Sequence, residues 1–121
     1  VAILAPYMKP LTQTVVDYIE AEGIEVCAAH ALEISDNLAV GRRPPELALN
    51  AAAEIDLTGA QALVLSACVQ MPAAAAIEAA EQKFGLPVVT ASSCTVRQML
   101  KALSVVPIVS GFGAALSSQN A

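Results

Sequence analysis

The sequence predicts an α/β fold, an open parallel four-stranded sheet with helices on both faces. Short continuous apolar runs, such as residues 1–5, are typical of strands buried on both sides of a parallel sheet. These runs alternate with longer segments whose apolar residues recur at helical spacing, and proline and glycine mark their ends. The resulting order βαβαβαβα requires right-handed crossovers, which put helices on both faces.

Two strands and two helices are predicted in the first half of the chain. Residues 1–5 form the first strand, and the helix that follows begins near Pro10 and stops at Gly23. Its inward residues, at helical spacing, are Leu11, Val15, Tyr18 and Ile19. Residues 24–29 are the second predicted strand, with Cys27 in its middle, and residues 31–43 are irregular. Pro44 and Pro45 then open a second helix.

The second half repeats the pattern. A third strand covers residues 62–66, and a helix follows Pro72 and stops at Gly85. A fourth strand covers residues 87–90. Ser92 or Ser93 is predicted to cap the last helix. The expected inward residues of that helix are Val96, Met99, Leu100 and Leu103. The tail, residues 105–121, is predicted to be a short strand or loop and a weak helix.

Composition limits the class of protein. The 121 residues suffice for a single domain, residues 1–121, with one core. Eleven acidic residues against six basic ones argue against a nucleic-acid partner. Two uncharged stretches, 57–77 and 102–121, contain Pro, Gln and Ser, so no membrane span is expected. Three cysteines without metal-type spacing indicate reduced thiols in the cytoplasm and no metal site.

The topology predicts where a site would lie. In open parallel sheets, ligands bind outside the carboxyl ends of the strands. This edge collects the loops at residues 6–9, 33–43, 67–72 and 91–95. Cys68 lies between an apolar strand and a helix start, where unpaired amides and the helix dipole favour a thiolate. Cys27 is expected to be a buried apolar residue, whereas Cys94 is an alternative pocket residue without the motif around Cys68.

Three segments carry a family resemblance. They read APYMKPL at residues 5–11, ALEISDNLAVGR at 31–42 and ALVLSACVQMP at 62–72. In this order and approximate spacing, they resemble the maleate cis-trans isomerases of the aspartate/glutamate racemase superfamily. The resemblance covers most of the chain, and each segment lies at a predicted strand end.

The resemblance implies a two-lobed enzyme of pseudo-symmetric α/β halves, with one cysteine from each half facing the active site. The chain is similar to the second, C-terminal half, and Cys68 falls on the cysteine that gives and takes the substrate proton. The first-half cysteine, which adds to the double bond of maleate, has no counterpart here. Tyr7 and Asn37 fall on positions that hold substrate carboxylates, and the backbone amides of Val69 and Gln70 lie where an anion would be bound.

The residue types suit this chemistry. A thiolate that adds to one alkene carbon leaves a single bond that can rotate, so no cofactor is needed. Phenol, amide and helix-start donors can stabilise the charge that develops on a carboxylate. We therefore expect a small dicarboxylate substrate, a missing N-terminal lobe or another chain as partner, a homo-oligomer, and no activity in the isolated chain.

Alternatives remain open. Another superfamily member, such as an amino-acid racemase or an arylmalonate decarboxylase, would share the fold and the cysteine. A flavodoxin-like binding module would share the fold without catalysis. Tyr7 could also pack over the sheet edge, and Asn37 could be an ordinary turn residue. Asp36 is expected to shape its loop rather than to bind a metal ion.

Overall fold

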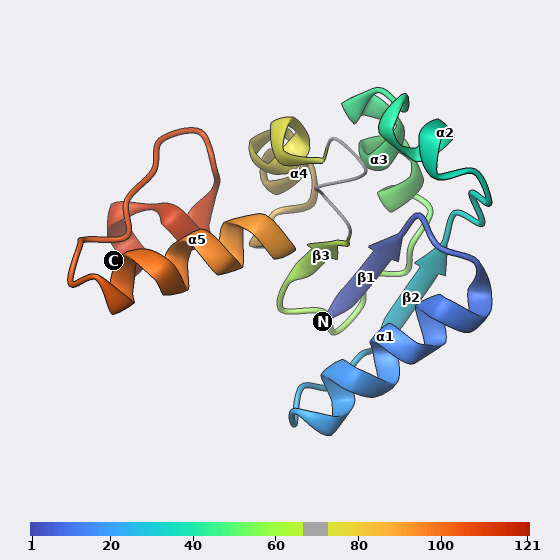
Figure 1. Cartoon of the computed structure of the whole chain (residues 1–121), viewed down its shortest axis with the longest axis horizontal. Coiled ribbons are helices and arrows are strands. Elements are labelled where there is room, and N and C mark those ends of the chain that lie inside the picture. The colour runs from blue at the N-terminus through green and yellow to red at the C-terminus, as the bar shows by residue number, and fades with distance from the viewer. Residues whose placement is uncertain (67–72) are drawn as a thin grey trace.

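The chain is described by a computed structural model that covers residues 1–66 and 73–121, with the backbone alone at Asn37. Its sheet has four parallel strands in the order β2-β1-β3-β4 (Figure 1). The strands are β1 (Ala2–Ala5), β2 (Ala28–Ala31), β3 (Leu63–Leu65) and β4 (Val88–Thr90). The predicted fold class is therefore confirmed, and β2 and β4 are the two edge strands.

Helices lie on both faces of the sheet. On one face, α1 (Lys9–Ala21) packs Val16 against Ile3 and Ala5 of β1. On the other face lie α3 (Pro45–Ala52) and α4 (Ile77–Phe84). A short helix, α2 (Asn37–Gly41), follows β2, and α5 (Ala91–Ala102) follows β4. The described 3₁₀ turns are Ala74–Ala76, Ala114–Leu116 and Ser118–Asn120.

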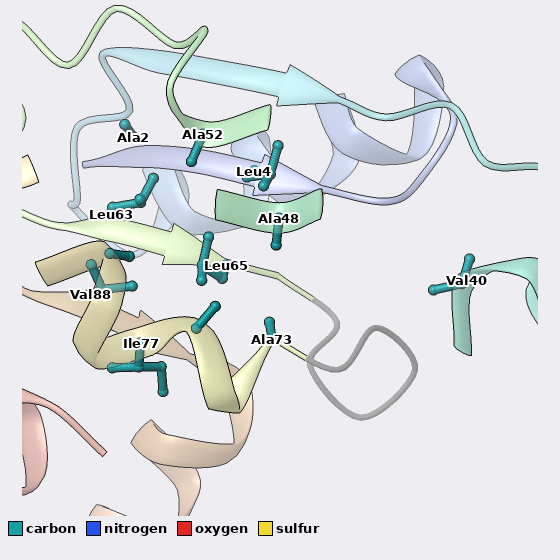
Figure 2. Close-up of a cluster of buried hydrophobic side chains, with 12 residues drawn as sticks. Ala2, Leu4, Val40, Ala48, Ala52, Leu63, Leu65, Ala73, Ile77 and Val88 are labelled. Carbon is teal, nitrogen blue, oxygen red and sulfur yellow. The ribbon is translucent and has the colours of Figure 1, made fainter. Parts of the chain in front are cut away.

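The larger core fills the space between the sheet and α3 and α4. Figure 2 shows Leu4, Leu65 and Ile77 in this cluster, with Ala48 and Ala52 of α3 over the sheet. Leu4, Leu65 and Ile77 have no exposed surface. Each large apolar side chain buried in this way contributes about 1.5–3 kcal/mol. Alanines on α3 and α4 let these helices approach the sheet closely. The packed layer therefore holds the strands, and with them the loops at their carboxyl ends, in place.

Two predicted elements are displaced. The second strand was expected at residues 24–29 but runs from Ala28 to Ala31, because it is set by pairing of Ala28 with Ala2 and of Ala31 with Ala5. Cys27 therefore precedes the strand. The expectation that it is buried is wrong, because Cys27 is exposed and its Sγ donates a hydrogen bond to the carbonyl of Val1.

The inward face of α1 also differs from the prediction. Leu11 and Tyr18 were expected to face the core, yet both are exposed, while Thr12 and Val16 are buried. Thr12 can be buried because its hydroxyl donates a 3.2 Å hydrogen bond to the carbonyl of Met8. The helical pattern thus predicted the helix correctly, but the buried face is the one that carries Thr12 and Val16 and not the one that carries Leu11 and Tyr18.

The last helix departs most from expectation. Its N-cap is Thr90, not Ser92 or Ser93, and Thr90 and Ser93 form a reciprocal capping box. Val96, Met99 and Leu103 were predicted to face inward and are exposed, and Leu100 is half-buried. In Figure 1 the helix extends away from the labelled strands β1, β2 and β3 and does not lie over them. Within the described residues, β4 is the last strand of the sheet.

Candidate active site

The loops after β1 and β2 lie side by side at the carboxyl edge of the sheet. Three backbone amides of the second loop donate hydrogen bonds to carbonyls of the first. Leu32 donates to Ala5 at 2.8 Å, Glu33 to Tyr7 at 3.1 Å and Ile34 to Pro6 at 2.9 Å. The sequence segments that carry Tyr7 and Asn37 are therefore joined directly where the topology predicts a site.

Tyr7 is half-buried, and it packs against the cluster formed by Ile3, Ala5 and Val16. Packing of one side of a tyrosine does not occupy its hydroxyl, which can donate a hydrogen bond. Since its backbone carbonyl is held by Glu33, Tyr7 has both a fixed main chain and a supported ring. This arrangement is suited to presenting a donor with little loss of conformational entropy.

Glu33 is a residue of this edge that sequence reasoning did not single out. Its φ is +55°, in the left-handed region that side chains other than glycine rarely adopt. Its carboxylate lies 3.9 Å from the ammonium of Lys9, the first residue of α1. Backbone strain of this kind often occurs at functional sites. A glutamate gives no sequence signal for it, so it could not have been predicted.

Asn37 is the first residue of α2. The preceding residue, Asp36, caps this helix, and its Oδ1 accepts a 2.9 Å hydrogen bond from the amide of Leu38. The expectation that Asp36 shapes its loop is thus confirmed. The cap holds the backbone of Asn37 at the start of a helix on the segment joined to Tyr7, which the sequence had predicted to be irregular.

The other half of the edge is formed by the ends of β3 and β4. The amide of Ser66 donates to the carbonyl of Leu4 at 2.8 Å, which extends the pairing of β3 with β1 to the edge. Cys68, Val69 and Gln70, the predicted catalytic and anion-binding residues, lie outside the described residues. Cys94 lies in the first turn of α5 and is exposed.

The electrostatics of the edge come from local groups. The start of α5 lies at this edge, where the positive end of the helix dipole favours an anion. Within residues 1–66 and 73–121, no group of three or more His, Cys, Asp and Glu could hold a metal ion. The pKa of Asp56 is lowered, chiefly because the side chain and then the backbone of Thr58 donate hydrogen bonds to it. Asp56 precedes β3 and so belongs to the opposite edge.

None of the described helices has the length and hydropathy needed to cross a membrane.

The chain is similar in sequence and in fold to known enzymes. The family model described as arylmalonate decarboxylase matches residues 1–116. The maleate isomerase of Pseudomonas putida strain KT2440 is 54% identical over 117 residues, which are 97% of this chain and 47% of that protein. The crystal structure of the maleate isomerase Iso from Pseudomonas putida S16 has a TM-score of 0.92 and 47% identity, covering 97% of this chain and 47% of its own.

A third relative bears on chemistry. It is the structure of a cysteine-to-serine mutant of the Nocardia farcinica maleate cis-trans isomerase with a covalently bound succinylcysteine intermediate. It is 41% identical with a TM-score of 0.90, and the match covers 95% of this chain and 47% of that one. The chain therefore spans about half the length of the relatives it matches.

Proposed function

This chain belongs to the arylmalonate decarboxylase family, and we propose that it is one lobe of an enzyme that isomerises maleate to fumarate. The observation that carries the proposal is the similarity to maleate isomerases along nearly the whole chain, at 54% identity for the Pseudomonas putida enzyme. The covalent succinylcysteine in the Nocardia farcinica relative supports a cysteine adduct. We assign the chain to the second, C-terminal lobe on the position of its cysteine motif.

The reaction proceeds through addition and elimination. A thiolate of the other lobe forms a C–S bond to one alkene carbon, and the π electron pair moves to the neighbouring carbon and its carboxylate. The thiol of Cys68 gives that carbon a proton and becomes a thiolate. After rotation about the single bond that replaces the alkene, the Cys68 thiolate takes a proton back, the C–S bond breaks, and fumarate leaves, which regenerates the thiolate of the other lobe and the thiol of Cys68.

The remaining roles follow from charge. The intermediate carries enolate-like charge on a carboxylate, and donors fixed in advance stabilise it more than they stabilise the substrate. Tyr7 supplies its phenol, and the amide of Glu33 holds the backbone carbonyl of this tyrosine by a hydrogen bond. Asn37 supplies an amide from the start of α2. The amides of Val69 and Gln70 bind the second carboxylate. No cofactor takes part, and the substrate is a small dicarboxylate in the cytoplasm.

The test is turnover of maleate by the 121-residue chain alone and together with the other half of the Pseudomonas putida maleate isomerase. Proton NMR follows the appearance of fumarate. We expect no conversion by either half alone and conversion by the pair. C68S should abolish it, whereas C27S should not, because Cys27 precedes β2 at the other edge of the sheet.

Two results would contradict the proposal. Turnover by the pair that survives C68S would remove Cys68 from the mechanism. Release of carbon dioxide from an arylmalonate, without fumarate from maleate, would instead favour decarboxylation, the activity after which the family model is described. An amino-acid racemase would act on neither compound.

A further inference from the structure

The last helix carries an apolar stripe that the described residues leave largely exposed. Val96 and Met99 of α5 and its C-cap residue, Leu103, are spaced at i, i+3 and i+7, so they lie on one side of the helix. Their exposed fractions are 38%, 58% and 70%, which is unusual for side chains of this size at helical spacing. We call these three residues the α5 stripe. Val106, four residues beyond the end of the helix, is also exposed, at 63%.

A different side of α5 is already occupied. Arg97 donates from Nε to the carbonyl of Ala115 at 3.0 Å and from its guanidinium to the carbonyl of Asn120 at 2.6 Å. The tail therefore lies along the helix, as Figure 1 also shows. Helical geometry separates Arg97 from the α5 stripe by about a third of a turn or more. The helix is thus anchored by the tail while its apolar face stays open.

A hollow of about 120 Å³ adjoins the α5 stripe. Its apolar wall is formed by Val96, Val109, Phe112 and Leu116. The capping pair Thr90 and Ser93 also lines it, so it lies where β4 ends and α5 begins. Apolar cavities of about 150 Å³ accept a benzene-sized group. This hollow therefore has room for one aliphatic side chain.

We propose that the α5 stripe and its hollow form the seat for the other half of the enzyme, with one apolar side chain of that half inserted in the hollow. The proposal rests on the proposed function. The occupant follows from the length of the relatives, because more than half of the Pseudomonas putida protein has no counterpart in this chain. It follows also from position, since α5 starts at the carboxyl edge, where the other half must supply its cysteine.

Exposed side chains elsewhere do not make the same surface. Tyr18 is as exposed as Leu103, at 69%, but it lies on α1 and is far from the β4 end of the sheet. Comparing these two positions separates a local effect of the stripe from a general effect of removing apolar surface. Lysine is the substitute of choice, because both residues lie near the end of a helix, where a positive charge is compatible with the helix dipole.

The experiment measures association of the 121-residue chain with the complementary half of the Pseudomonas putida maleate isomerase. Tagged chain is co-purified with that half, and the dissociation constant and mass are measured by titration and light scattering. L103K and M99K should weaken association at least about tenfold, since each would bury an unpaired charge. Y18K should leave it unchanged. Thermal melts of the variant chains alone control for folding.

A photoreactive side chain at position 99 identifies the occupant. We expect cross-links to the complementary half. Cross-links to a second copy of the 121-residue chain, equal affinity of L103K and wild type, or failure of the wild-type halves to associate would each overturn the proposal. Turnover is read separately: association through the stripe without fumarate formation refutes the proposed function alone, whereas turnover by L103K at wild-type affinity refutes the seat alone.

Discussion

Replacing Gly113 by alanine should destabilise the chain strongly, because this glycine is required by both its backbone and its surroundings. Its φ of +73° and ψ of −171° lie in a region that is accessible almost exclusively to glycine. A Cβ here would lie 2.6 Å from Cγ2 of Ile77 and 2.7 Å from Oε1 of Glu81. That oxygen accepts hydrogen bonds from the amides of Val88 at 3.0 Å and Ala114 at 2.9 Å. The added methyl group would displace the carboxylate that joins α4, β4 and the tail.

The expected cost combines two effects. The backbone conformation alone costs on the order of 1–3 kcal/mol, and lost hydrogen bonds to a charged group cost about 1.5–3 kcal/mol. We expect G113A to lower the free energy of unfolding by about 3 kcal/mol or more, and Tm by about 10 °C.

Urea and thermal unfolding of the 121-residue chain measure the effect. G111A is the matched control, because Gly111 has a φ of +86° but no atom within 4 Å of its added Cβ. A loss in G113A no larger than that in G111A would refute the reasoning, since backbone strain would then explain both. The loss of unfolding free energy in E81Q should lie between the losses in G111A and G113A, because the glutamine side chain retains one acceptor oxygen.

Three other predictions concern the carboxyl edge. Cys68 should be alkylated faster than Cys27 or Cys94, as peptide mapping across pH would show. Faster labelling of Cys27 or Cys94 would contradict the assignment of Cys68 as the reactive thiol. In the two-half enzyme, Y7F and N37A should each lower kcat/KM by a lost donor to a carboxylate, about 1.5–3 kcal/mol, with unchanged Tm; an unchanged kcat/KM with a lowered Tm would make both residues structural. T90A should cost about 1 kcal/mol of stability by removing the N-cap of α5, measured by urea unfolding, and an unchanged midpoint would mean that Ser93 caps the helix alone.

The sheet could be predicted because its strands are buried on both faces. Continuous apolar runs such as residues 62–66 have few alternative structures in a small domain, and β1, β3 and β4 fall within the predicted runs. The strand β2 was displaced because its alanines carry little pattern of their own. Its register depends on pairing with β1, which local sequence does not report.

Buried faces of helices were harder to predict than helices. Periodicity shows that a face is apolar but not which surface covers it, so the same pattern served for α4, which packs on the sheet, and for α5, which does not. At the candidate site, the joining of the loops of Tyr7 and Asn37 followed from topology. The left-handed backbone of Glu33 did not, because it depends on hydrogen bonds made between those loops.

The buried core and the exposed α5 stripe have different consequences for the chain. The core between the sheet and α3 and α4 is closed within the described chain, since Leu4, Leu63 and Ile77 are fully buried there. The α5 stripe, in contrast, is exposed on the helix that begins where β4 ends. Substitutions in the closed core should therefore change the stability of the isolated chain, whereas substitutions in the stripe should change association and leave that stability nearly unaltered. A chain with this division can fold as a unit and still depend on the other half of the enzyme for its chemistry.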